Sequence, residues 1–444
     1  MAAEAQPSWP ERSEGEDEEH QEKRKQHVHL VVLVHGWMGN DKEMGSIQEA
    51  LEKNFSNDDK RKHDNENSNS EHDGARPPSS SSSSSPSSLM HVVSVKSNVD
   101  QTHDGIAAGG KRIATEIDGL VRDLGATTLS FVGNSLGGLY ARYALAHLDC
   151  LTEKEGGNEQ ADQSTNNDTE CPSRRIVEPL LFVTTATPHL GESRNTYLPI
   201  PRFVEYGIGS ALQQTGRDLF NISPIIHELA RQDEYVRPLR RFRKRVAYAN
   251  AFGTDFQVPV STAAFLSVNS NNPHHVLKGN RVEGQEDNNV NDSYQKDGSS
   301  PRIALTVETT REEVPPSSSS TTTTAGGVGS ADTASLLDSM GWTKVFCDVR
   351  TAIPLPSLPL PSFWTTKPPT RETPSSSSPM TSQQVLDRVG GYGGRLSFPM
   401  GHTVLIANSK SDRDARINAN GKPFVNRLAQ DMVADIEMCT TDRP

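Results

Sequence analysis

One stretch, residues 131–140 with the sequence Phe-Val-Gly-Asn-Ser-Leu-Gly-Gly-Leu-Tyr, constrains the fold of this chain more than any other. It reads as a short apolar strand, a tight turn that carries Ser135, and the start of a helix. The turn has the form Gly-x-Ser-x-Gly, and larger side chains at the glycine positions would collide with neighbouring backbone. The start of the helix would point backbone N–H groups at negative charge beside the serine. The stretch therefore predicts a nucleophile elbow; the alternative is a glycine-rich turn used only for close packing or for binding an anion.

Apolar segments on both sides of this turn alternate between strand and helix patterns. A continuous aliphatic run such as residues 27–34 is typical of a strand that is buried on both faces of a parallel sheet. Alternation at this spacing predicts a mostly parallel sheet with right-handed crossovers and flanking helices, so the expected fold class is α/β. The predicted strands are 27–34, 90–95, 128–132, 179–186, 245–251 and 342–349, and the predicted helices are 41–53, 104–124, the segment after Ser135, and 423–436.

Polar, low-complexity stretches interrupt this pattern. Residues 1–26 are expected to be a disordered acidic tail, and residues 27–444 a single α/β domain. The domain is expected to carry long disordered insertions, because serine-rich and Asn/Asp-rich segments have little to bury; these lie at about 56–88, 151–175, 269–333 and 351–380.

A small helical cap is predicted at about 192–243, between two strands, where it would cover a pocket. Two short helical patterns occur there, around 203–213 and 223–231. Ser223 is expected to cap the second helix, since it precedes a proline suited to a first helical turn.

Charge and cysteine content exclude several classes of protein. A net charge of -12 argues against a nucleic-acid partner. The four cysteines are scattered, without the spacing of a zinc or redox motif, so no metal or cofactor is expected and the compartment is expected to be reducing. We find neither a signal peptide nor a run of about 18 apolar residues, so any membrane contact would be peripheral.

A serine nucleophile on this fold needs an acid and then a histidine later in the chain. Asp255 is the best acid, because it follows the strand 245–251 in a turn with Gly253 and could orient an imidazole through a buried hydrogen bond. The alternative is an aspartate that only caps a turn. Asp218 and Asp233, in the presumed cap, and Asp348, within a strand, are the competing acids.

His402 is the best base, since it lies after the last long strand and before the last helix. His274 and His275 also follow the acid, but they lie in a polar insertion where a side chain is hard to position rigidly. His35 and His189 precede the acid. We expect His35 to shape the loop after the first strand and His189 to line or brace the site.

An oxyanion would be held by two backbone N–H groups. One is that of Leu136, which follows the nucleophile. The other comes from residues 35–40, here called the oxyanion loop, where Trp37 is the expected donor and Met38 the alternative. A cluster of positive charge at 237–245 is either a solvated helix end or a surface for anionic phospholipid headgroups.

Together these residues resemble a known family. The blocks His-Gly-Trp-Met-Gly-Asn at 35–40, Gly-Asn-Ser-Leu-Gly-Gly-Leu-Tyr-Ala-Arg-Tyr-Ala at 133–144 and Thr-Pro-His-Leu-Gly at 187–191 are similar to the putative serine esterase family of lipase-like α/β-hydrolases. Weaker similarity extends over 215–219 and 248–263, and faintly from Trp342 onward. By this resemblance Ser135 is the nucleophile, Asp255 the acid and His402 the base. The family usually has histidine where this chain has Asn134, a position that packs under the elbow.

The resemblance implies an α/β-hydrolase fold and a cofactor-independent lipase or esterase, including the phospholipase class, that acts on a lipid or acyl ester through an acyl-enzyme. It further implies a cytoplasmic protein that meets membranes or lipid droplets peripherally. Two other interpretations stay open: a non-catalytic α/β-hydrolase used for binding or as a scaffold, and an acyltransferase or thioesterase with the same triad.

Overall fold

A computed structural model describes most of the chain. Its centre is one eight-stranded sheet with the order β2-β1-β3-β4-β5-β8-β7-β6. The first six strands in this order are parallel to one another; β7 pairs antiparallel with β8, and β6 pairs antiparallel with β7 at the edge. The described residues are 27–68, 88–151, 176–193, 201–268, 270–277, 302–312, 330–355, 358–359, 378–390, 395–397 and 399–441.

The predicted strands are present, with ends that differ by a residue or two. The parallel strands are β1 (His27–Val34), β2 (Ser88–Ser94), β3 (Thr128–Asn134), β4 (Glu178–Thr185), β5 (Lys244–Asn250) and β8 (Thr343–Asp348). The antiparallel strands are β7 (Arg302–Thr309) and β6 (His274–Val276), and a separate two-stranded pair is formed by β9 (Leu358–Pro359) and β10 (Arg395–Leu396).

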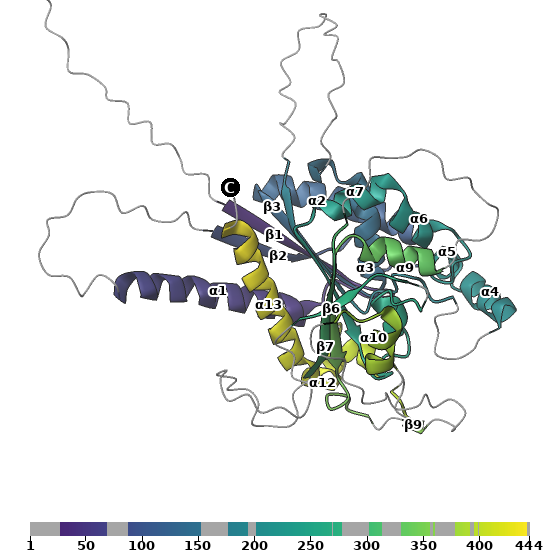
Figure 1. Ribbon diagram of the computed structural model, residues 1–444. Helices are drawn as coiled ribbons and strands as arrows, with labels where there is room; N and C mark the ends of the chain where they lie inside the picture. The colour runs from purple at the N-terminus through teal and green to yellow at the C-terminus, as the bar shows by residue number, and fades with distance from the viewer. Residues whose placement is uncertain are drawn as a thin grey trace, which may run out of the picture.

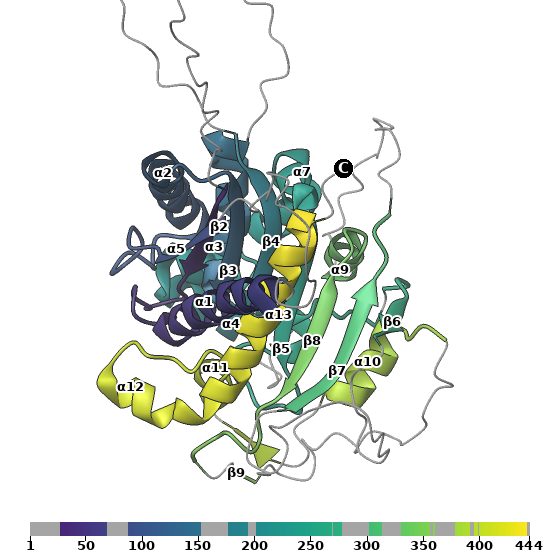
Figure 2. The ribbon, with the colours of Figure 1, turned by 90° about the vertical axis from the view of Figure 1, so that its left-hand side faces the viewer.

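Helices cover both faces of the sheet, as Figures 1 and 2 show. One face packs against α2 (Ile106–Leu124), α3 (Leu136–Ala144), α6 (Ile225–Arg231), α7 (Asp233–Arg241) and α9 (Ser330–Asp338). The other packs against α1 (Gly45–Ser68), α11 (Met400–Val404) and α13 (Lys422–Thr441). The remaining helices are α4 (Arg202–Ala211), α5 (Gln213–Leu219), α8 (Val260–Ala263), α10 (Ser382–Val389) and α12 (Asp412–Ile417).

Side-chain alternation along the strands builds a separate core on each face. In β1, Leu30 and Val32 join the core under α2 and α3, whereas Val31 and Leu33 join the core under α1 and α13. Successive strand residues point to opposite faces, so a strand covered on both sides must be apolar throughout. This explains the continuous aliphatic run of β1, which lies between β2 and β3 with helices over both faces.

Two of the expected insertions contain regular structure. Helix α1 continues to Ser68 and β2 begins at Ser88, so the segment outside the described residues is shorter than 56–88. The prediction of one continuous insertion at 269–333 is wrong, because this range contains β6, β7 and the start of α9. The buried side chains Leu305 and Val307 hold β7 in the sheet. The tail 1–26, nearly all of 151–175 and most of 351–380 lie outside the described residues.

In its described residues, the segment predicted as a cap contains four helices, α4 to α7, of which α5 and α7 were not predicted. The expected capping role of Ser223 is wrong: its hydroxyl donates to Asp218 at 2.6 Å, and α6 has no side-chain cap. Among the described residues, no helix combines the length and apolar character that crossing a membrane requires.

Candidate active site

Ser135 stands on the turn between β3 and α3, as the sequence predicts. Its backbone has φ 54° and ψ -128°, a conformation that L-residues rarely adopt. The Ser135 N–H donates to the carbonyl of Thr185 on the neighbouring strand at 2.8 Å, which holds the strained turn in place. The side chain is half-buried and lies at the carboxyl end of the parallel strands, where α/β folds bind their ligands.

Close backbone packing explains the glycines of the elbow. A Cβ at Gly133 would lie 2.5 Å from the Cα of Gly138, and one at Gly137 would overlap the carbonyl oxygen of Val34. Atoms cannot approach this closely without a shift of the backbone, so α3 sits directly on the ends of β1 and β3 only because these positions lack side chains. Both elbow glycines thus lie where neighbouring backbone leaves no room for a side chain.

Asp255 lies in the loop after β5 and is fully buried. Its Oδ1 atom accepts hydrogen bonds from the backbone N–H groups of Gln257 and Val258, both at 3.0 Å. Its Oδ2 atom accepts from the side-chain amide of Asn250 at 3.0 Å. These donors compensate the carboxylate for its lost hydration and fix its orientation.

His402 lies on the short helix α11 and is the residue that Asp255 orients. Its Nδ1 atom is 3.0 Å from Oδ2 of Asp255. The helix is docked on the acid loop, because Gly401 N–H donates to the carbonyl of Thr254 at 3.0 Å and a Cβ at Gly401 would overlap that oxygen. The histidine is thus held on a helical turn.

Burial by itself lowers the pKa of the His402 imidazole, but two negative charges oppose it. The charge and hydrogen bond of Asp255 raise the pKa, and the charge of Glu43 raises it further, so the net result is a pKa above the ordinary 6.5. The site therefore favours a protonated imidazole, which is the species that forms when the histidine accepts a proton.

The serine and the histidine lie at the same end of the sheet. Glu43 binds the side chain of Asn134, next to Ser135, and its charge also acts on His402. Within the described residues, no hydrogen bond joins the Ser135 hydroxyl to the imidazole. Catalytic hydrogen bonds are often long in unliganded enzymes and shorten when substrate binds.

Hydrogen bonding distinguishes the two candidate donors of the oxyanion loop, Trp37 and Met38. Met38 N–H donates to Oγ1 of Thr102 at 3.0 Å, and Met38 has a left-handed backbone with φ 54°. Among the described residues, neither Trp37 N–H nor Leu136 N–H has a hydrogen-bond acceptor. Met38 N–H thus already has an acceptor, whereas in the described part of the chain the N–H groups of the two expected donors do not.

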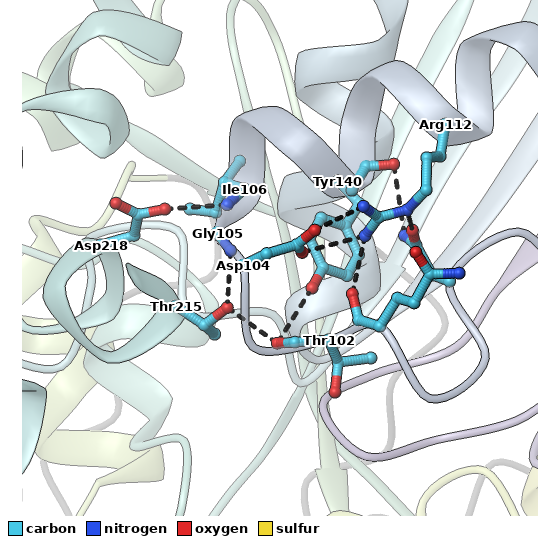
Figure 3. A network of polar contacts seen from close by, with 11 residues as sticks. Thr102, Asp104, Gly105, Ile106, Arg112, Tyr140, Thr215 and Asp218 are labelled. Carbon is cyan, nitrogen blue, oxygen red and sulfur yellow. Dashed lines mark hydrogen bonds and ion pairs between the residues drawn. The ribbon is translucent and has the colours of Figure 1, made fainter. Parts of the chain in front are cut away.

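Thr102, which binds Met38, also contacts the predicted cap, and Figure 3 shows its contacts with Thr215 and Tyr140. The Thr102 carbonyl accepts from the hydroxyl of Thr215 on α5 at 2.7 Å and from that of Tyr140 on α3 at 3.4 Å. The Thr215 hydroxyl oxygen also accepts from Gly105 N–H at 3.0 Å. One residue therefore contacts the oxyanion loop, the elbow helix and the cap.

Asp218, one of the competing acids, accepts hydrogen bonds from other residues of the same network. Its Oδ2 atom accepts from Ile106 N–H at 2.8 Å, at the start of α2, where a carboxylate is favourable for the helix dipole (Figure 3). Its Oδ1 atom accepts from Gln214 and Ser223. Asp218 therefore anchors the cap to α2.

The remaining competing acids and the competing base His274 make structural contacts. Asp233 pairs with Arg237 on the surface, and Asp348 pairs with Arg350. His274 is buried in β6 with its Nε2 atom 3.0 Å from Nζ of Lys344, and burial together with that charge lowers its pKa to about 3. This imidazole is neutral and belongs to a buried cluster at the sheet edge.

His35 and His189 are both buried and make local polar contacts. His35 is buried, with Nδ1 3.1 Å from the Gly36 carbonyl within the oxyanion loop. His189 is fully buried, and its Nε2 atom is 3.0 Å from the hydroxyl of Thr184. Burial and the nearby charges of Arg142 and Lys344 hold the pKa of His189 well below 6.5, so it braces the fold as a neutral ring.

Positive charges of the 237–245 cluster are largely paired within the molecule. Arg243 forms an ion pair with Glu178, and Lys244 forms one with Asp435. Arg245 is buried and donates to backbone carbonyls. These contacts favour the structural interpretation of the cluster over a headgroup-binding surface.

The sequence reasoning did not identify Glu43 or Thr102. Both act through contacts with residues distant in sequence, and neither lies in a local pattern that would reveal them. Cys150, Cys347 and Cys439 are buried free thiols, and the described residues contain no group of His, Cys, Asp and Glu side chains suited to a metal ion.

Comparison with known proteins finds a matching family model and several more distant relatives. The family model described as "Putative serine esterase (DUF676)" matches residues 24–77 and 75–268, more than half of the sequence. "Putative lipase ROG1" of Saccharomyces cerevisiae is 28% identical over 211 residues, which cover 47% of this chain and 28% of that protein. "Putative lipase C4A8.10" of Schizosaccharomyces pombe is 25% identical over 301 residues, which cover 64% of this chain and 31% of that protein. The matched part of the chain thus spans less than a third of the length of these relatives.

Two of the solved structures that align with part of the chain are described as lipases. The mature form of lipase BlEst2 from Bacillus licheniformis aligns with a TM-score of 0.28 at 13% identity, covering 53% of this chain and 69% of that one. A monoacylglycerol lipase from Paleococcus ferrophilus aligns with a TM-score of 0.27 at 12% identity, covering 53% and 77%.

Proposed function

Because this chain belongs to the putative serine esterase family and has an α/β-hydrolase fold, we propose that it is a serine hydrolase that cleaves carboxylic esters of lipids. The observation that carries the proposal is the 3.0 Å hydrogen bond between His402 and Asp255. It lies at the same end of the sheet as Ser135 on its strained turn. A buried carboxylate that orients an imidazole near such a serine is the arrangement that activates a hydroxyl as a nucleophile.

In the proposed first step, Nε2 of His402 removes the proton from the Ser135 hydroxyl as its oxygen attacks the ester carbonyl. Asp255 holds the proton on Nδ1, so that Nε2 presents its lone pair to the serine, and it stabilises the imidazolium that forms. The four hydrogen bonds that Asp255 accepts, from His402, Asn250, Gln257 and Val258, keep this carboxylate in one orientation throughout.

The tetrahedral intermediate places a negative charge on the former carbonyl oxygen. The N–H groups of Leu136 and Trp37 would bind it, with added stabilisation from the amino-terminal end of α3. These groups are fixed before substrate arrives: α3 is seated on β1, and Met38, next to Trp37, is held by Thr102.

In the second step the imidazolium gives its proton to the departing alkoxide, which leaves as an alcohol. Ser135 then carries the acyl group. A water molecule, deprotonated by His402, attacks this acyl-enzyme and releases a carboxylic acid, and the proton returns to the Ser135 oxygen.

Exposed apolar side chains on the cap favour a water-insoluble substrate. Phe203, Tyr206 and Ile208 of α4 are 77%, 47% and 37% exposed. A cluster of large apolar side chains on a helix surface is typical of contact with lipid or with a partner. Flotation with vesicles tests this: Phe203→Ser should weaken binding to neutral vesicles, whereas Arg237→Ala should leave it unchanged.

The test of the function is hydrolysis of a panel of lipid esters, lysolipid esters and acyl thioesters by the full chain, with identification of the products. We expect release of fatty acid from at least one ester, and loss of this activity in Ser135→Ala. Ser56→Ala, at an exposed serine of α1, is the matched control and should behave as the wild type. Equal hydrolysis by Ser135→Ala would contradict the proposal, and absence of turnover by the wild type across the panel would favour a binding role.

A further inference from the structure

We propose that Glu43 is a positioning residue that ties the oxyanion loop to the nucleophile elbow, a role that rests on the serine hydrolase function proposed above. Glu43 lies just before α1, and its side chain is buried, with the residue only 4% exposed. Its Oε1 atom accepts two hydrogen bonds, from Gly36 N–H at 3.1 Å and from the side-chain amide of Asn134 at 2.8 Å. A single carboxylate oxygen thus joins the loop that would supply one oxyanion donor to the residue beside the nucleophile.

Asn134 links Glu43 to the neighbouring strand β4 and so extends this bridge. Asn134 uses both ends of its amide: the nitrogen donates to Glu43, and the oxygen accepts from the hydroxyl of Thr185 at 3.0 Å. Thr185 is also the residue whose carbonyl holds Ser135 N–H. This explains how asparagine is accommodated where the family usually has histidine, since it offers a donor to Glu43 and an acceptor to Thr185.

Close packing restricts the position of the oxyanion loop around the carboxylate of Glu43. A Cβ at Gly36 would lie 2.9 Å from Cβ of Ser135, so the loop backbone rests directly against the nucleophile. A Cβ at Gly39 would overlap Oε2 of Glu43 and lie 2.8 Å from Nδ1 of His35. Both glycines thus let the loop close around the carboxylate, and a displaced carboxylate would displace the loop.

The segment that follows His402 is held at the same place. Ser409 N–H donates to the carbonyl of Glu43 at 3.2 Å, and the Ser409 hydroxyl donates to the carbonyl of Lys42 at 2.7 Å. Lys410 also donates to the carbonyl of Met38 in the oxyanion loop. The turn that contains Glu43 therefore contacts the three segments that would carry the donor, the nucleophile and the base.

The charge of Glu43 adds an effect that geometry alone would not produce. Burial lowers the pKa of His402, whereas Asp255 and then Glu43 raise it, and among the described residues these two carboxylates are the charges that act on the imidazole. Removing the charge at position 43 should therefore move the titration of His402 to lower pH. A side chain at position 43 that was neutral and only filled space could be replaced without moving this midpoint.

The test measures the rate of labelling by a fluorophosphonate probe against pH, together with the thermal unfolding midpoint, for the full chain. Glu43→Gln keeps the shape and one acceptor but removes the charge. We expect its labelling rate to fall by about tenfold, since charge-assisted hydrogen bonds are roughly twice as strong as neutral ones, and the midpoint of the acid limb to move to lower pH. Glu49→Gln, at an exposed position of α1, is the control and should change neither quantity.

Asn134→Ala removes the bridge from the other side while leaving the charge. It should reduce labelling by about 100-fold at most, the order of loss that a misplacement of 1 Å produces, with the midpoint of the acid limb unchanged. The double variant Glu43→Gln/Asn134→Ala should lose less than the product of the two single effects, because both residues act through one hydrogen bond. If Glu43→Gln fails to fold, Asn134→Ala alone decides: labelling at the wild-type rate would overturn the bridge.

A wild-type rate and midpoint in folded Glu43→Gln would overturn the inference, as would a lower unfolding midpoint without a change in either kinetic quantity. These outcomes are distinct from failure of the proposed function. In that case the wild type itself would not be labelled, or Ser135→Ala would be labelled equally well.

Discussion

The Nδ1 atom of His402 lies 3.0 Å from Oδ2 of Asp255, although 147 residues separate them in the chain. Two local contacts make this long-range pairing possible: the Asp255 loop binds α11 through the Thr254 carbonyl, and the absence of a side chain at Gly401 allows the helix to approach. The intervening sequence, which includes β6, β7, α9 and β8, extends the sheet on one side without separating the two residues.

Asp255→Asn should retain the fold and lose most of the activity. An amide can replace the carboxylate sterically, but it cannot stabilise an imidazolium, and its NH2 group favours the wrong imidazole tautomer. The expected decrease in kcat is about 10⁴-fold. Asp123→Asn, at an exposed position of α2, is the matched control. A decrease of less than tenfold, with an unchanged circular dichroism spectrum, would show that Asp255 does not orient the base.

The pH dependence follows from the raised pKa of His402. The base must be neutral, and although burial lowers its pKa, the two carboxylates raise it above 6.5 in total. Activity should therefore rise with pH, and the midpoint of the acid limb should lie above 6.5. Initial rates of kcat/KM across the pH range, on protein shown to be folded at each pH, measure it. A midpoint below 6.5 would contradict the arrangement of charges around His402.

Thr102→Val should impair catalysis more than stability. The substitution removes the acceptor for Met38 N–H and so releases the backbone next to Trp37, the proposed oxyanion donor. We expect kcat to fall by about 10- to 100-fold, the order of loss that a misplacement of 1 Å produces, with little change in KM. Thr115→Val is the control, because the exposed Thr115 hydroxyl bonds only within α2. Equal kinetics for the two variants would remove the proposed role of Thr102.

Substitution of an elbow glycine should lower stability, whereas substitution of Gly119 should not. Gly137→Ala would place a Cβ on the carbonyl of Val34, so it should destabilise the fold or abolish soluble expression. At Gly119, within α2, an added Cβ meets nothing within 4 Å, and Gly119→Ala should stabilise by about 0.5–1 kcal/mol. Denaturant unfolding of both variants measures the contrast. A Gly137→Ala protein as stable as the wild type would show that the elbow is not packed as described.

The buried cluster at the edge of the sheet predicts a strong effect on stability. Nζ of Lys344 lies 2.6 Å from Oδ1 of Asp338, and both side chains are fully buried. Lys344→Met leaves a buried carboxylate without its partner, which should lower the free energy of unfolding by about 3–5 kcal/mol. Lys344→Met/Asp338→Leu should recover most of this loss. Breaking the partly exposed pair of Lys244 and Asp435 should cost at most about 1 kcal/mol.

Features set by neighbouring residues could be predicted from the sequence. The elbow was predicted because its strand, glycines and helix are contiguous, and the parallel sheet because a strand buried on both faces is apolar throughout. Asp255 and His402 were chosen by their order and by their positions after strands, and the structure brings these two side chains into contact.

Features set by distant contacts could not be predicted in this way. Nothing near Glu43 indicates that its carboxylate binds Asn134, which is 91 residues away. Ser223 has the local pattern of a helix cap, but Asp218 offers its hydroxyl a competing acceptor. β7 was missed because the polar residues around it hide a short alternating strand, which becomes stable only when β8 pairs with it.

The most direct test of the central claim is to map the site of covalent labelling. The full chain is treated with a fluorophosphonate probe, its intact mass is measured, and the modified peptide is sequenced by tandem mass spectrometry. We predict one adduct, on Ser135, that is absent from Ser135→Ala and forms far more slowly in His402→Ala. An unmodified wild-type protein, or a Ser135→Ala variant labelled as fast as the wild type, would contradict the assignment of Ser135 as the nucleophile.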